Sequence, residues 1–151
     1  MPSTYKTPGV YVEEISIFPP SVASVETAVP AFIGYTERAD RNGESLSMKP
    51  TRVKSMVEFE EWFGSAPPRD VTVTLDDNDE VIGADSQADF YLYDSLRMYF
   101  ANGGGKCYIV SVGTYKTGGV VNTVDGAAIL NGLAKLEKED EPTILLSPDA
   151  T

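Results

Sequence analysis

The sequence predicts an α/β protein with a mixed, partly parallel sheet, flanking helices, a β-hairpin insertion and an extended amino-terminal β arm. The parallel part follows from residues 106–147, where an apolar run, an amphipathic pattern and a second apolar run indicate strand, helix and strand. Such a unit is right-handed and places its two strands parallel in one sheet. Strand patterns on either side of an acidic turn at residues 76–79 predict the hairpin. An isolated strand pattern at residues 9–15 predicts the arm.

Composition and charge exclude several classes of function. The 151-residue chain has 12 lysine and arginine residues against 23 aspartate and glutamate residues, which gives a net charge of −11. This balance argues against nucleic-acid and anionic membrane surfaces, which require basic clusters. No histidine is available as a general base or metal ligand, and the single Cys107 indicates a reducing compartment and no internal disulfide. Because no apolar run approaches a membrane span or a signal peptide, we expect no stable membrane insertion.

The strand pattern at residues 9–15 is separated from the rest of the chain by turn-forming residues. Two prolines lie among the residues before it, and Pro19 and Pro20 follow it. A strand isolated in this way pairs either with an edge of its own sheet or with another chain, because both satisfy its backbone groups. The residues alone leave both pairings open.

The next elements carry clear boundary signals. Residues 28–36 predict a buried strand with Pro30 at its start or on an edge, and residues 37–47 predict a loop. Ser55 and Glu58 form a capping box, which predicts a helix that stops at Gly64. The apolar face of this helix comprises Val57, Phe59, Trp62 and Phe63, with Trp62 as a core anchor.

The hairpin is predicted from strands at residues 71–75 and 80–83. Its acidic turn resembles a calcium loop only loosely. Counted from Asp76, an EF-hand requires glycine in the sixth place and glutamate in the twelfth, and this chain has Val81 and Gln87 there. We interpret the cluster as a solvated turn.

A central helix is predicted next. Ser86 and Asp89 resemble a second capping box, and Asn102 and Gly103 tolerate the backbone conformation that ends a helix. The residues at helical spacing are Leu92, Leu96 and Tyr99.

The glycine run and lysine at residues 103–106 suggest a phosphate-binding loop, but their context argues against one. A P-loop requires glycine at position 100 and a hydroxyl at position 107, where this sequence has Phe100 and Cys107. The run also joins a helix to a following strand, whereas a P-loop joins a strand to a helix. We interpret it as a helix stop before a buried strand at residues 106–112.

Residues 113–147 complete the predicted strand–helix–strand unit. Glycines at positions 113, 118 and 119 predict a flexible link, and Asp125 caps the helix that follows. The final strand, residues 143–147, is expected to be buried and ends at Pro148. The apolar side of the helix is expected to comprise Ile129, Leu130, Leu133 and Leu136.

The sequence contains no set of residues that is typical of a catalytic site. No dinucleotide fingerprint follows a strand, and a Ser/His/Asp arrangement is impossible without histidine. Cys107 lies among apolar residues and is expected to be an inert core thiol. We therefore expect no enzyme activity, no cofactor and no metal.

Five segments together resemble the sheath proteins of contractile phage tails and related injection machines. Their order and spacing match over nearly the whole chain, and the set is more specific than any one motif. The segments are YKTPGVYVEEI at residues 5–15, VPAFIGYT at 29–36, the FxxWFG helix end at 59–64, YFANGGGKCYIV at 99–110, and the stretch from Leu133 and Glu137 to PDA at 148–150.

The resemblance implies a structural subunit of a contractile tail sheath. Family members form rings of six in a helical sleeve around an inner tube protein, and contraction drives the tube through a membrane. Terminal arms of one subunit add strands to a sheet in its neighbours. The resemblance implies an arm and hinge at residues 1–25 and an incomplete α/β sheath domain at residues 26–151, with a hairpin insertion at 66–87.

The inter-subunit arm is expected to comprise Pro8, Gly9, Val10, Tyr11, Val12, Glu13, Glu14 and Ile15. Its partners are then other sheath subunits, with no nucleic acid. The resemblance also implies assembly in the bacterial cytoplasm and a place in a virion tail or a phage-tail-like particle.

Length is the main difference from the family, whose members are typically much longer. We therefore expect the chain to be the amino-terminal part of a sheath subunit, or a natural truncation. Two alternatives stay open: an α/β nucleotide-binding or enzyme domain remnant, and a stand-alone adaptor that caps a sheath through the same arm.

Overall fold

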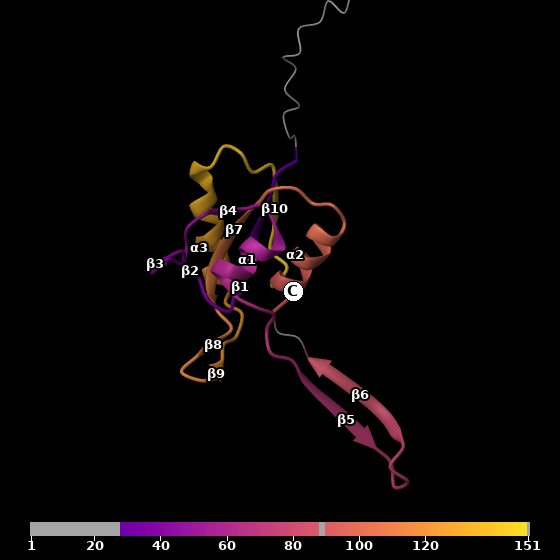
Figure 1. Ribbon diagram of the computed structural model, residues 1–151. Coiled ribbons are helices and arrows are strands. Elements are labelled where there is room, and N and C mark those ends of the chain that lie inside the picture. The colour runs from indigo at the N-terminus through magenta and orange to yellow at the C-terminus, as the bar shows by residue number, and fades with distance from the viewer. Residues whose placement is uncertain (1–27, 88–89, 151) are drawn as a thin grey trace, which may run out of the picture.

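A four-stranded mixed sheet forms the centre of the protein, whose computed structural model describes residues 28–87 and 90–150. The strand order is β10-β1-β7-β4, with β1 parallel to both neighbours and β4 antiparallel to β7 (Figure 1). These strands are β1 (Pro30–Thr36), β4 (Thr51–Val53), β7 (Cys107–Thr114) and β10 (Ile144–Leu146). The mixed, partly parallel sheet predicted from the sequence is confirmed, and Pro30 stands at the start of its strand.

Helices cover both faces of this sheet. The helices are α1 (Met56–Phe63), α2 (Leu92–Ala101), α3 (Gly126–Lys135) and the short 3-10 helix η1 (Leu136–Lys138). Helices α1 and α2 pack over Phe32 and Ile109 on one face, and α3 packs over Ile33 and Val110 on the other. Because β1 and β7 have helices on both sides, they are apolar along most of their length.

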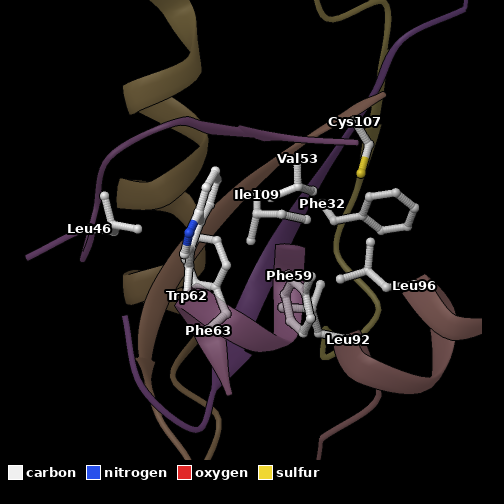
Figure 2. Packing of buried hydrophobic residues seen from close by; sticks show 10 residues of the cluster. All are labelled: Phe32, Leu46, Val53, Phe59, Trp62, Phe63, Leu92, Leu96, Cys107 and Ile109. Carbon is white, nitrogen blue, oxygen red and sulfur yellow. The ribbon is translucent and has the colours of Figure 1, made fainter. Parts of the chain in front are cut away.

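The core between the sheet and helices α1 and α2 is rich in aromatic residues (Figure 2). The rings of Phe59 and Phe63 stack with 5.3 Å between their centroids. Trp62 is buried as the sequence predicts, and the Arg41 guanidinium lies 4.4 Å from the centroid of its ring. The buried members are Phe32, Leu46, Val53, Phe59, Trp62, Phe63, Leu92, Leu96, Cys107 and Ile109.

Local capping signals position α1 and α3. Ser55 Oγ accepts a 3.2 Å hydrogen bond from Glu58 N–H, and the Glu58 carboxylate accepts a 2.7 Å bond from Lys54 N–H. Gly64 ends α1 with a φ of 87°, a conformation that favours glycine. Asp125 accepts a 2.9 Å bond from Ala127 N–H at the start of α3. Both predicted helix starts are confirmed.

The predicted hairpin insertion is confirmed as β5 (Asp70–Leu75) and β6 (Val81–Gln87), which pair antiparallel and project from the body (Figure 1). Its acidic turn is held by hydrogen bonds to a side chain. Asp76 Oδ1 accepts 2.8 Å bonds from the N–H groups of Asn78 and Glu80, and these bonds lower the pKa of Asp76.

Two short hairpins replace segments that were predicted as loop and link. The first pairs β2 (Asp40–Arg41) with β3 (Glu44–Ser45) across Asn42 and Gly43, which both have positive φ. An Asn-Gly pair suits a two-residue hairpin turn for this reason. The second pairs β8 (Lys116–Thr117) with β9 (Val120–Val121) across two glycines.

The start of α2 differs from the prediction. Ser86 does not cap a helix but lies in β6, where it pairs with Val71. Asp89 falls outside the described residues. The first two N–H groups at the start of the helix, those of Tyr91 and Leu92, instead donate to the carboxylate of Asp149. The predicted capping box at Ser86 was wrong for two reasons. Ser86 belongs to strand β6, and the acceptor at the start of α2 is Asp149, which is distant in the sequence.

This one carboxylate joins β1, α2 and the segment after β10. Asp149 is 2% exposed, and its Oδ2 accepts a 2.7 Å hydrogen bond from Tyr35 N–H. Its Oδ1 accepts bonds of 2.6 Å from Tyr91 N–H and 3.0 Å from Leu92 N–H. A Cβ at position 34 would overlap Asp149 Oδ2, so Gly34 is needed for this approach. Burial raises the pKa of Asp149, and the three N–H donors partly offset that rise.

A second carboxylate ties strands β4 and β7 to the segment before β10. Glu141 accepts hydrogen bonds of 2.9 Å from Lys106 Nζ and 2.6 Å from Tyr108 Oη, and the Arg52 guanidinium lies 3.6 Å away. The bond from Lys106, followed by that from Tyr108, lowers the pKa of Glu141 to about 2.

We predict that Asp149→Ala lowers the free energy of unfolding by about 3 kcal/mol, because three N–H groups lose a charged acceptor and two of them become buried without a partner. Asp125→Ala is the matched control, since it removes an exposed cap and should cost about 1 kcal/mol. Chemical denaturation measures both. Equal losses in the two variants would contradict the central role of Asp149.

We predict that Glu141 contributes stability that depends on pH. Its folded-state pKa is depressed from an ordinary 4.5, so the contribution is present above that value and is lost as the pH falls toward about 2. Unfolding curves of wild type and Glu141→Gln should therefore converge as the pH falls from about 5 to about 2. Added salt should narrow the difference at neutral pH, because the pair is partly exposed. A difference that stays constant across this range would refute the prediction.

Candidate interaction surfaces

β10 is an apolar edge strand that no other described residue covers on its outer side. Among residues 28–87 and 90–150 it pairs with β1 alone. Its residues Ile144, Leu145 and Leu146 are 44%, 53% and 40% exposed. The prediction that this strand is buried is therefore wrong. The aliphatic sequence of residues 144–146 does not distinguish a central strand from an edge strand.

A groove runs between β10 and α2 on one face of the sheet. Its volume is about 470 Å³, and Leu146 lines it together with Phe32, its partner in the β1 register. On the opposite wall, Met98 of α2 is 65% exposed. The other lining residues are Ser95, Tyr99, Asn102, Gly103 and Gly104.

The glycine run forms one end of this groove and ends α2, as the sequence predicts. Gly103 has a φ of 84°, and its N–H donates to Phe100 O at 3.1 Å. The N–H of Gly104 donates to Tyr99 O at 2.9 Å. Both N–H groups satisfy the carboxyl end of the helix, so they are not arranged to cradle a phosphate.

The outer face of α3 is also apolar, which the sequence analysis missed. Ile129 and Leu136 are buried, but Leu130 and Leu133 are 67% and 37% exposed. Gly132 lies between them and lets the helix approach Val112 closely. The helix therefore faces the sheet along Ile129, Gly132 and Leu136, whereas Leu130 and Leu133 of the predicted apolar side remain exposed.

The hairpin carries a third exposed apolar surface. Val71, Val73 and Leu75 alternate along β5 and so lie on one face of the ribbon, with 63%, 48% and 49% of each side chain exposed. Across the turn, Val81 is 65% exposed. A two-stranded ribbon of this kind has little stability of its own in water.

A cavity of about 380 Å³ lies at the base of the hairpin. It is lined by Glu37, Ala66, Pro68, Tyr115 and Lys116. The Glu37 carboxylate accepts hydrogen bonds from Ser65 N–H and Oγ–H at 2.6 and 2.9 Å, and these bonds lower its pKa. The Tyr115 hydroxyl is buried and has no hydrogen-bond partner within the described residues, and burial raises its pKa.

The residues that the sequence analysis assigned to the inter-subunit arm, positions 8–15, lie outside the described residues. Cys107 is fully buried in β7, and burial raises the pKa of its thiol to about 12, as expected for a core thiol. Across residues 28–87 and 90–150, no group of three potential ligands is placed to hold a metal ion. No helix in that part of the chain is long and apolar enough to cross a membrane.

The sequence did not predict the position of Asp149 as the acceptor for β1 and the start of α2. The sequence signal for it is an acidic residue directly after Pro148, where a short apolar strand ends. The exposed edge of β10 gives no such signal.

Comparison with solved structures finds a contractile sheath. The chain is similar to the helical sheath of the anti-feeding prophage (AFP) in its contracted state, solved by cryo-EM, with a TM-score of 0.50 and 25% identity over 98% of this chain. The chain spans 33% of the length of that sheath protein. No protein-family model and no curated protein matches the sequence. The resemblance predicted from the sequence motifs is confirmed, and the chain has the fold of part of a contractile sheath protein.

Proposed function

We propose that this protein is a structural subunit of a contractile tail sheath that polymerises around an inner tube. The observation that carries the proposal is the match to a sheath protein over 98% of the chain. The segments that resemble sheath proteins also fall on the structural framework. They include β1, the end of α1, and the passage from α2 into β7.

The surface chemistry supports a role in assembly. A net charge of −11 makes copies of the chain repel one another, so contacts between them require apolar burial or main-chain pairing. Three exposed apolar surfaces are available for such contacts: the β10 edge, the outer face of α3 and the hairpin.

The finer mechanism is part of the same proposal. Residues 8–15 act as an arm that adds a strand to a sheet of a neighbouring subunit, and residues 18–24 act as its hinge. Subunits form rings of six in a helical sleeve, and contraction drives the inner tube through a membrane. The subunits assemble in the bacterial cytoplasm and end in a virion tail or a phage-tail-like particle.

We predict that deleting residues 1–15 leaves the folded body intact but stops sheath assembly in cells that make the particle. The reason is that the described framework begins at residue 28, well after the deleted segment. Circular dichroism and thermal unfolding test the body, and electron microscopy of particle preparations tests assembly. Deleting only residues 2–4 keeps the strand pattern and is the control. Normal long sheaths from the larger deletion would reject the proposed role of the arm.

A further inference from the structure

Three Asn-Gly pairs occur in the chain, at residues 42–43, 102–103 and 131–132. In such a pair, the backbone nitrogen of the glycine can attack the side-chain amide of the asparagine. Glycine obstructs this attack less than any other residue because it has no Cβ and leaves the backbone free to rotate. The three pairs share this chemistry, so their reactivity depends on how the fold holds each of them.

The pair at residues 102–103 is held by hydrogen bonds at the end of α2. The side-chain amide of Asn102 donates a 2.7 Å bond to Met98 O. The nitrogen that would attack it, that of Gly103, donates to Phe100 O at 3.1 Å. Both reacting groups are therefore occupied while the helix end is intact.

The pair at residues 131–132 lies inside α3. An interior N–H group of an α-helix donates to the carbonyl four residues earlier, so the nitrogen of Gly132 is engaged in the helix. A Cβ at this position would also overlap Val112, which shows how closely the helix packs on β7 here. Attack on the Asn131 amide would require the helix to open and to leave the sheet.

The pair at residues 42–43 forms the turn of the β2–β3 hairpin and has neither protection. Asn42 and Gly43 are exposed, with φ values of 51° and 83°. The strands pair through Arg41 and Glu44, which leaves the Gly43 N–H outside the ladder. A Cβ at Gly43 would meet no atom within 4 Å, so the space around this backbone is open. Because each strand has two residues, the turn opens locally at low cost.

The hairpin contacts α1 through Arg41. Strand β2 lies against this helix (Figure 1), and the Arg41 guanidinium is 4.4 Å from the centroid of the Trp62 ring. The length of the turn fixes which residues pair across the hairpin, here Arg41 with Glu44. A longer backbone in the turn would therefore displace Arg41 either from this pairing or from the ring of Trp62.

We propose that Asn42 is a site of spontaneous deamidation, and that the reaction loosens the β2–β3 hairpin from α1. The Gly43 nitrogen attacks Cγ of Asn42 and closes a succinimide ring. The bond from Cγ to Nδ2 breaks, and ammonia leaves with the proton from the Gly43 nitrogen. Water then opens the ring at either carbonyl and returns a proton to that nitrogen, which gives aspartate or isoaspartate. In isoaspartate the main chain passes through Cγ, which lengthens the turn by one carbon atom.

The inference goes beyond the proposed function, and its test does not involve assembly. The full chain is incubated at mildly alkaline pH in water labelled with heavy oxygen, and its peptides are then mapped by mass spectrometry. The product at Asn42 should carry the label, because water opens the ring. We expect deamidation at Asn42 to be at least about tenfold faster than at Asn102 or Asn131, whose glycine N–H groups must first be released.

Unfolded protein is the matched control for this selectivity. In denaturant each of the three pairs is the same free dipeptide, so we expect the three rates to converge. In the folded protein, a rate at Asn42 that does not exceed those at the other two asparagines would overturn the proposal. Rates that differ as much in denaturant as in the folded state would also overturn it, because the selectivity would then not come from the fold.

Trp62 reports whether the hairpin loosens, since it is the only tryptophan in the chain and is 8% exposed. Its quenching by acrylamide should increase as wild type forms isoaspartate. Asn42→Gly keeps a turn with positive φ but has no amide to lose, so its quenching should stay constant through the same incubation. Asn42→Asp has the charge of one product without the longer backbone and should match fresh wild type. Isoaspartate at position 42 with Trp62 quenching unchanged would overturn the loosening.

Discussion

The Asp149 carboxylate is the interaction on which the arrangement of sheet, helix and edge depends. It takes three N–H groups from two elements that the sequence places far apart, one in β1 and two at the start of α2. Because Asp149 is 2% exposed, removing its carboxylate would leave buried N–H groups without an acceptor. Gly34 provides the space, and Pro148 turns the chain out of β10 toward the site. Fixing the helix start in this way also fixes the groove between α2 and β10.

The two faces of the sheet are covered by helices that pack in different ways. The difference determines where apolar side chains remain exposed. On the α1 and α2 face, large aromatic side chains fill the space, and the groove appears only where the sheet ends at β10. On the α3 face, Gly132 brings the helix close to Val112, which turns Leu130 outward. Since the chain carries a net charge of −11, these apolar places are where neighbouring copies gain most from contact.

Local signals in the sequence predicted most of the fold. The capping residues Ser55 and Asp125, the stop at Gly64 and the buried runs of β1 and β7 each act within a few residues, so their patterns identify them. The start of α2 was mispredicted because its acceptor is distant in sequence. The burial of β10 was mispredicted because composition does not distinguish an edge from a centre. The arm at residues 8–15 stays a prediction, since it lies outside the described residues.

An uncovered apolar edge such as that of β10 favours pairing with a further strand, and the groove beside it adds apolar surface at the same place. On a chain with a net charge of −11, charge repulsion opposes contacts that lack matched apolar burial or main-chain pairing. Within the described residues, the β10 edge is therefore a place where a further strand, from this chain or from another, gains both kinds of contact.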